Sequence, residues 1–198
     1  MSVIVAIKKN GRVYMGTDTL TSCGEQKKNF FAQGNRKITR FENGILLGGV
    51  GKMHNAQLLF AHSEIFTVPE DGNMTKRYVV ENIIPKIFDL YREHDMGEKE
   101  EGEPRLLGGA YVLAYKDKIF LIDSDFDVTV LEHYVSVGSG ADLTRAGLAE
   151  LDAEDVSDSE MIENRLLELL RISASYVKSV GAPFYLIDTE NLEYKLAQ

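Results

Sequence analysis

Apolar and polar residues follow one another along this chain in blocks, and the strand-like blocks come first. The strand-like runs of the first quarter lie at residues 2–7, 13–15, 37–41 and 45–51. Asn10-Gly11 joins the first two runs, and Asn-Gly between such runs is a strong short-range signal for a β-hairpin. Asn43-Gly44 joins the other two, after the polar stretch 22–35. We therefore predict two consecutive hairpins.

After the second hairpin the apolar residues recur at helical spacing. They mark one helical face over residues 56–66, which ends near Pro69, and a second helix over about 75–94. Pro85 lies inside the second helix and is expected to kink it, because proline lacks the N–H that a helix interior uses. The charged, glycine-containing stretch 94–105 predicts an exposed loop.

The second half of the chain again places strands around a pair of helices. Its strand-like runs lie at residues 109–115, 119–123, 128–137, 184–187 and 194–196. Between them Asp142 is predicted to cap a helix that reaches Leu151, and Asp158 or Ser159 to cap another. The apolar side of that last helix is predicted to hold Ile162, Leu166, Leu169, Leu170 and Ile172. Segregated blocks of strands and helices favour antiparallel sheets covered by helices over a doubly wound parallel sheet.

Composition and charge narrow the class of protein. The chain has 198 residues, 44% hydrophobic and 27% charged, which is ordinary for globular proteins, so we expect one domain over 1–198. The formal net charge of −9 argues against a surface that follows nucleic-acid phosphates. No apolar run approaches the roughly 20 residues of a membrane helix, and the first residues do not resemble a signal peptide. Cys23 is the single cysteine, which favours a reducing, cytoplasmic location.

Three motif-like strings lack the residues that their chemistry requires. Gly48–Lys52 resembles a phosphate loop, but Leu46 and Met53 stand where a P-loop needs glycine and Ser or Thr. Residues 123–127 resemble the start of a calcium loop whose required glycine and glutamate are absent. The four histidines show no zinc-binding spacing. We therefore predict neither a cofactor nor a metal.

Ser2 is the residue that raises the question of catalysis. A small second residue normally lets methionine aminopeptidase remove Met1, which would leave a hydroxyl and a free α-amine on Ser2. An α-amine with a pKa of about 7.7–8.0 is a usable general base at neutral pH, and a serine hydroxyl needs an adjacent base to act as a nucleophile. For Ser2 alone, the plainer interpretation is that serine is simply a common second residue.

The order of motifs after Ser2 changes this balance. Asp18 follows Ser2 by sixteen residues, and Lys37 stands in the string Asn35-Arg36-Lys37-Ile38 after a polar loop. Gly48-Gly49-Val50-Gly51 comes next, and the run 134–137 ends in Gly138-Ser139-Gly140. This pattern resembles the proteasome-type N-terminal nucleophile (Ntn) hydrolases, most of all the bacterial HslV-type peptidases and the proteasome β subunits. The resemblance covers most of the chain and implies an α+β fold, a four-layer αββα sandwich.

The resemblance also implies a catalytic role for three charged or polar residues. Ser2 is then the nucleophile, and Lys37 lies beside its hydroxyl, where an ammonium group favours the alkoxide and keeps the α-amine neutral. Asp18 pairs with Lys37 and holds it charged and oriented. Taken one at a time, Asp18 could merely end a strand and Lys37 could be a surface residue.

Two more positions receive roles from the same resemblance. Gly51, in preference to Gly49, offers a backbone N–H to the developing oxyanion, because glycine lets backbone and substrate approach closely. Ser139 resembles the family serine that hydrogen-bonds near the α-amine and helps to shuttle its proton. Taken alone, Ser139-Gly140 could be a plain turn from strand to helix.

The chain departs from the family pattern in places that bear on activity. Residues 176–182 contain no Asp or Glu, although many active relatives carry an acid there, and Val3 stands where the family usually has threonine. If Met1 is retained, the α-amine lies on the wrong residue and the mechanism fails.

The function we expect is hydrolysis of peptides or unfolded proteins. The resemblance implies a homo-oligomeric ring as the assembly, with an ATPase as a possible partner. Two alternatives stay open: an amidase or acylase acting on a small molecule, and a non-catalytic structural subunit like the proteasome α-type chains.

Overall fold

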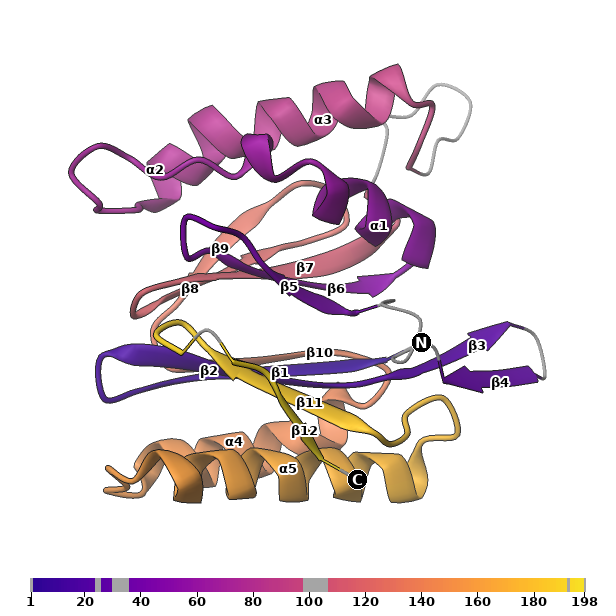
Figure 1. Ribbon diagram of the computed structural model, residues 1–198, viewed down its shortest axis with the longest axis vertical. Coiled ribbons are helices and arrows are strands. Elements are labelled where there is room, and N and C mark those ends of the chain that lie inside the picture. The colour runs from indigo at the N-terminus through magenta and orange to yellow at the C-terminus, as the bar shows by residue number, and fades with distance from the viewer. Residues whose placement is uncertain (1, 24–25, 30–35, 98–106, 192, 198) are drawn as a thin grey trace.

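Two β-sheets face each other in the middle of the molecule, and helices cover both outer faces (Figure 1). This computed structural model describes residues 2–23, 26–29, 36–97, 107–191 and 193–197, with the backbone alone for the described part of 22–29. The arrangement is a four-layer αββα sandwich, as predicted.

The first sheet has the N-terminal strand near its centre. Its strand order is β10-β1-β2-β11-β12, and every neighbouring pair is antiparallel. The strands are β1 (Val3–Lys9), β2 (Arg12–Asp18), β10 (Tyr134–Gly138), β11 (Phe184–Asp188) and β12 (Lys195–Ala197). Asn10 and Gly11 have φ values of 54° and 76°, which a two-residue hairpin turn requires, so the first predicted hairpin is confirmed.

The second sheet is also antiparallel, with the order β5-β6-β7-β8-β9. Its strands are β5 (Ile38–Arg40), β6 (Leu46–Gly51), β7 (Gly109–Tyr115), β8 (Lys118–Ile122) and β9 (Val128–Leu131). The second predicted hairpin is therefore confirmed as β5–β6. The predicted run 128–137 divides into β9 and β10, which belong to different sheets.

Each sheet carries its own helices. The second sheet is covered by α1 (Met53–Ala61), α2 (Lys76–Tyr78) and α3 (Ile84–Glu93), and the first by α4 (Ala141–Ala153) and α5 (Ser159–Tyr176) (Figure 1). A π-helical segment, Val79–Ile83, joins α2 to α3 directly before Pro85. Pro85 therefore stands in the first turn of α3, where its missing N–H is tolerated.

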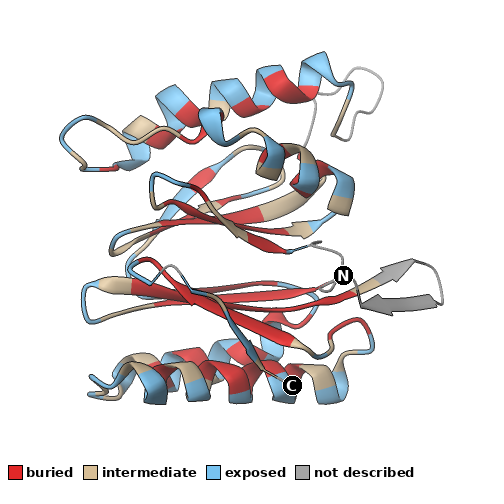
Figure 2. Ribbon diagram, in the orientation of Figure 1, coloured by how far each residue is buried: buried red, intermediate tan, exposed pale blue. Residues whose placement is uncertain are grey.

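Three apolar clusters fill the spaces between the four layers. One lies between the two sheets and includes Ile4, Met15 and Val112, and a second packs α1 and α3 onto the second sheet. The third packs α4 and α5 onto the first sheet. Buried residues accordingly line both faces of each sheet and only the inner faces of the helices (Figure 2).

Three sequence predictions about local structure need correction. The helical face predicted over 56–66 is wrong in extent, because α1 ends at Ala61 and a short 3-10 helix follows. The predicted Asp142 cap is also wrong. Gly140 occupies the cap position of α4 without a side-chain hydrogen bond, because the turn before α4 is packed against the N-terminus. Ile172 is 40% exposed, because Leu169 and Leu170 already fill the face toward the sheet.

Part of the polar stretch 22–35 forms β-strands. β3 (Leu20–Cys23) and β4 (Gln26–Asn29) form a two-stranded hairpin that projects from the end of the sandwich (Figure 1). The rest of that stretch, and most of the predicted loop 94–105, lie outside the described residues. Asp158 caps α5 as predicted, since its carboxylate accepts hydrogen bonds from two backbone N–H groups of the first turn.

Candidate active site

Asp18 ends β2 and is fully buried at the end of the first sheet. Its Oδ1 accepts hydrogen bonds from the Val3 N–H (3.1 Å) and from Lys37 Nζ (2.8 Å). Its Oδ2 accepts from the N–H groups of Leu20 (3.2 Å) and Gly181 (3.3 Å). One carboxylate therefore ties together the starts of β1 and β3, the residue before β5, and the loop before β11.

Lys37 reaches Asp18 from the other sheet. It directly precedes β5, and its side chain is only 2% exposed. Besides the ion pair, Lys37 Nζ donates to the Leu20 carbonyl at 2.6 Å. The buried ammonium group thus bridges the two sheets.

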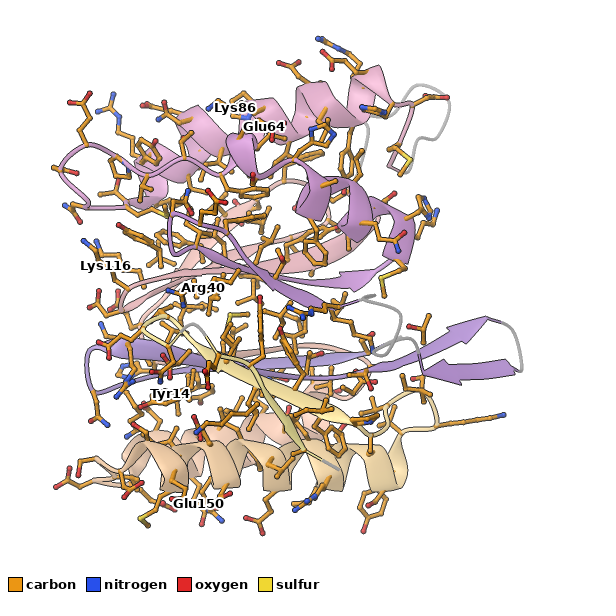
Figure 3. All side chains as sticks on the ribbon, viewed as in Figure 1. Tyr14, Arg40, Glu64, Lys86, Lys116 and Glu150 are labelled. Atoms are coloured by element: carbon orange, nitrogen blue, oxygen red, sulfur yellow. The ribbon has the colours of Figure 1, made fainter. Side chains whose placement is uncertain are left out.

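β5 is an edge strand of only three residues, and Arg40 fixes it in place. The Arg40 guanidinium donates to three backbone carbonyls in the turn after β11, those of Asp188 (3.0 Å), Thr189 (3.3 Å) and Asn191 (2.9 Å). Figure 3 labels Arg40 at the level between the two sheets. The strand that carries Lys37 is therefore anchored to the opposite sheet.

Burial and pairing act in opposite directions on the two charges. Burial raises the pKa of the Asp18 carboxyl above its ordinary value, and the charge and hydrogen bond of Lys37 oppose this, as do the Val3 and Gly181 amides. Burial lowers the pKa of the Lys37 ammonium below its ordinary value, and Asp18 opposes that change. Displaced pKa values of this kind are common for groups in catalytic sites.

The peptide bond between Ser2 and Val3 is held on both sides. The Ser2 carbonyl accepts from Ser139 Oγ (3.2 Å) and from the Gly140 N–H (3.5 Å), while the Val3 N–H donates to Asp18. Ser2 itself is 6% exposed. Ser2 therefore has a fixed place at the head of β1, directly beside the Asp18–Lys37 pair.

Ser139 connects Ser2 to a residue that the sequence did not indicate. Ser139 Oγ lies 3.0 Å from Ser179 Oγ, and Ser179 is buried. Because the single hydroxyl proton of Ser139 is donated to the Ser2 carbonyl, Ser179 must donate to Ser139. The result is a chain of hydroxyl groups that runs from the 177–183 loop to Ser2.

The predicted Gly138-Ser139-Gly140 turn fits closely against the N-terminus. A side chain at Gly138, which has φ of +97°, would place its Cβ 2.2 Å from the Ser2 carbonyl oxygen. A Cβ at Gly140 would lie 2.9 Å from Val3 Cβ. Both glycines are needed for this approach.

The glycine-rich end of β6 lies on the other side of this turn. A Cβ at Gly138 would lie 3.2 Å from Val50 Cγ1, so β6 ends close to the carbonyl of Ser2. The Gly49 N–H already donates to the Lys37 carbonyl at 2.9 Å. By strand alternation the Gly51 N–H faces the same side of β6, one pair beyond Lys37. The Gly49 amide is therefore already used within the described part of the sheet, so Gly51 remains the better candidate of the two for binding an oxyanion.

The structure thus gathers Ser2, Asp18, Lys37 and Ser139 around one end of the first sheet, with the strand that carries Gly51 beside them. Sequence reasoning missed Ser179 and the Gly181 amide. Both lie in residues 176–182, which lack an acid, and the small hydroxyl residue Ser179 is the sequence signal that points to this loop.

The described part of the chain offers neither a cluster of metal ligands nor a membrane-spanning helix. Within it, no group of three or more His, Cys, Asp or Glu side chains is placed to hold a metal ion. No helix in that part is long and apolar enough to cross a membrane.

Comparisons with known proteins bear on the fold. No protein-family model matches the sequence. A solved structure of Thiobacillus denitrificans BPH superimposes with a TM-score of 0.72 at 17% identity, over 94% of this chain and 96% of that one. BPH in complex with epoxomicin gives 0.70 at 18%, over 94% and 97%. Eukaryotic HslV from Trypanosoma brucei gives 0.67 at 17%, over 94% and 98%.

The fold is that of the HslV-type, proteasome-like Ntn hydrolases. The predicted resemblance is therefore confirmed for the architecture. At such low identity, an HslV-type fold alone does not assign a reaction, and the chemistry must be argued from the residues of this chain.

Proposed function

We propose that this chain is a peptidase of the Ntn class, and that Ser2 becomes its nucleophile when the Met1–Ser2 bond is cleaved. The observation that carries the proposal is the buried Asp18–Lys37 ion pair, which contacts the amide of Val3 directly after Ser2. Pairs of this kind are costly to bury, and a position beside a candidate nucleophile gives this one a chemical purpose.

The reaction follows from these positions. The neutral α-amine of Ser2 takes the proton of Ser2 Oγ, and the oxygen forms a bond to the substrate carbonyl carbon. The electron pair of the C=O bond moves to its oxygen. When the oxyanion collapses, the C–N bond breaks, and the leaving amine takes the proton held by the α-amine. Water then attacks the ester with the α-amine again as base, which releases the acid and restores the hydroxyl.

The surrounding residues each support one step. The Lys37 ammonium stabilises the developing negative charge on Ser2 Oγ and keeps the α-amine neutral. The Gly51 amide stabilises the oxyanion, and loss of one such donor typically lowers the rate by about 10²–10³-fold. Ser139, oriented by Ser179, relays the proton to the leaving amine: its oxygen accepts the proton from the α-amine while its own hydroxyl proton turns from the Ser2 carbonyl to the leaving amine.

The same proposal extends to substrate and assembly. We expect peptides or unfolded proteins as substrates, a cytoplasmic location, a homo-oligomeric ring and an ATPase partner. Apolar side chains on the outer face of α4 and α5, Leu143, Ile172 and Tyr176, are 40%, 40% and 79% exposed and are suited to subunit contacts. Light scattering measures the assembly, and ATP-dependent stimulation by a cell extract tests the partner.

Intact-mass spectrometry and a nucleophile variant test the proposal. The purified protein should lack the mass of Met1, and it should hydrolyse members of a fluorogenic peptide panel. Ser2→Ala should abolish hydrolysis, whereas the matched variant Ser2→Thr, which keeps a hydroxyl on the N-terminal residue, should retain it. Unchanged hydrolysis by Ser2→Ala would exclude Ser2 as the nucleophile.

Other outcomes assign the alternatives. Hydrolysis of small amides but of no peptide, lost in Ser2→Ala, indicates an amidase or acylase. Retained Met1 together with no hydrolysis indicates a non-catalytic structural subunit.

A further inference from the structure

Asn55 is a polar residue of α1, at the apolar core that packs α1 and α3 onto the second sheet. It lies in the first turn of α1 and is fully buried. Its Nδ2 donates to the Leu107 carbonyl at 2.7 Å, whereas its buried Oδ1 has no hydrogen-bond partner among the described residues. A buried acceptor without a partner is destabilising, because it has given up its hydrogen bonds to water. Stability therefore does not explain an asparagine at this position, and the bond to Leu107 needs another reason.

Residues 107–109, which Asn55 holds through Leu107, lie in close contact with Gly51. Leu107 is followed by Gly108 and Gly109, and Gly109 pairs with Gly51 across β6 and β7. A Cβ at Gly51, which has φ of +117°, would lie 2.5 Å from the Gly108 carbonyl oxygen and 2.6 Å from Gly109 Cα. The Gly108 carbonyl also accepts from the N–H of Lys52, at 3.2 Å. A shift of residues 107–109 would therefore move the amide of Gly51.

A second set of hydrogen bonds from Asn55 leads to Gly49. The Asn55 carbonyl accepts from Tyr91 Oη at 3.4 Å, and Tyr91 Oη lies 3.1 Å from Tyr111 Oη. The Tyr111 ring packs on Gly49, where a Cβ would lie 2.7 Å from Tyr111 Cε1. Burial raises the pKa of Tyr111 to about 12, so its hydroxyl stays protonated near neutral pH. Asn55 thus fixes the backbone on two sides of residues 49–51.

We propose that Asn55 is a positioning residue that sets the Gly51 amide for the oxyanion, through its hydrogen bond to Leu107. This rests on the proposed peptidase function. Because the Gly51 amide acts on the transition state, loss of the bond should lower kcat and leave KM nearly unchanged.

The test compares Asn55→Ala with Leu59→Ala in the full-length protein. Leu59 lies one turn further along α1, fully buried in the same core, so its truncation removes packing and leaves the Asn55–Leu107 bond in place. At a temperature well below both unfolding transitions, Asn55→Ala should lower kcat about 10- to 100-fold. Leu59→Ala should lower the unfolding temperature at least as much and keep kcat within twofold of the wild type.

Hydrogen exchange supplies a readout that does not depend on activity. Amides of residues 48–52 and 107–110 should exchange faster in Asn55→Ala than in Leu59→Ala. If Asn55→Ala does not fold, Asn55→Ser provides the same comparison.

A wild-type kcat in Asn55→Ala, or equal losses in both variants, would overturn the inference while leaving the peptidase function intact. If the wild-type protein has no Ser2-dependent hydrolysis, the proposed function fails instead. Unchanged exchange at 48–52 would then also exclude the coupling between Asn55 and Gly51.

Discussion

Two sets of ion pairs in this molecule differ in almost every respect. Asp18 and Lys37 form a single pair between the sheets, 0% and 2% exposed. Arg165 on α5 contacts Glu150, Glu154 and Glu168 at 3.0–3.4 Å on the outer helical layer, with its side chain 35% exposed. Glu150 is labelled in that layer in Figure 3.

The comparison shows that an ion pair can be held in a rigid geometry without stabilising the fold. Exposed pairs cost little to form and contribute little, because water solvates the charges equally well. A buried pair loses that solvation and persists only when further hydrogen bonds satisfy both groups. Asp18 receives three such bonds from backbone amides and Lys37 gives one to a carbonyl, so the pair is held rigidly at a net cost. We expect substitutions of Arg165 to change stability and hydrolysis very little, and substitutions of Lys37 to lower both strongly.

The largest expected effect is that of Lys37→Met. Removing the ammonium leaves the Asp18 carboxylate buried and unpaired, which should lower the free energy of unfolding by about 3–5 kcal/mol. The rate of peptide hydrolysis should fall at least about 10³-fold, because the charge that stabilises the Ser2 alkoxide is lost. Initial rates and urea unfolding measure both. A rate within tenfold of the wild type would contradict the assigned role.

The double variant Asp18→Asn with Lys37→Met sharpens the comparison. With both charges removed, at least about 1 kcal/mol of the stability lost in Lys37→Met should return, because no unpaired charge stays buried. Hydrolysis should stay absent. Recovery of activity together with stability would show that Lys37 acts only on folding.

The pH dependence of hydrolysis should be bell-shaped. Activity should fall as the pH drops through the pKa of the Ser2 α-amine, ordinarily about 7.7–8.0, since the protonated amine is no base. It should also fall as the pH rises through the pKa of Lys37. Burial places that pKa below the ordinary 10.5, so the alkaline loss should begin below pH 10.5. A rate that stays constant through pH 10.5 would argue against a charged Lys37 in the mechanism.

A smaller effect is expected for Ser179→Ala. This variant removes the hydroxyl that donates to Ser139 Oγ and should lower kcat about five- to tenfold, the value of one hydrogen bond. Ser175→Ala is the matched control, because that hydroxyl donates to the Arg171 carbonyl on the exposed side of α5. Equal rates in the two variants would remove Ser179 from the proton path.

The smallest effect is predicted for Arg165→Ala. Despite its three acidic partners, the free energy of unfolding should change by less than about 1 kcal/mol, and hydrolysis should not change. Urea unfolding at low and high salt is the measurement. A loss comparable with that of Lys37→Met would show that exposure does not separate the two sets of charges.

The sequence by itself determined most of the architecture. Asn10-Gly11 and Asn43-Gly44 predicted both hairpins, because few residues other than glycine and asparagine adopt the backbone of such turns. The separated blocks of strands and helices predicted antiparallel sheets covered by helices. The site of Ser2, Asp18 and Lys37 was indicated only by the resemblance to the Ntn hydrolases, because taken one at a time each residue has a plainer explanation.

Tertiary structure decided the remaining features, and the reason is that they depend on contacts between distant segments. The run 128–137 is compatible with one strand or two, and the tertiary structure decides for two, because β9 pairs in the second sheet and β10 in the first. Ser179 lies forty residues from Ser139, and Asn55 lies fifty-two from Leu107. Hydrogen bonds across such separations leave no local pattern, since each partner is set by how the layers pack.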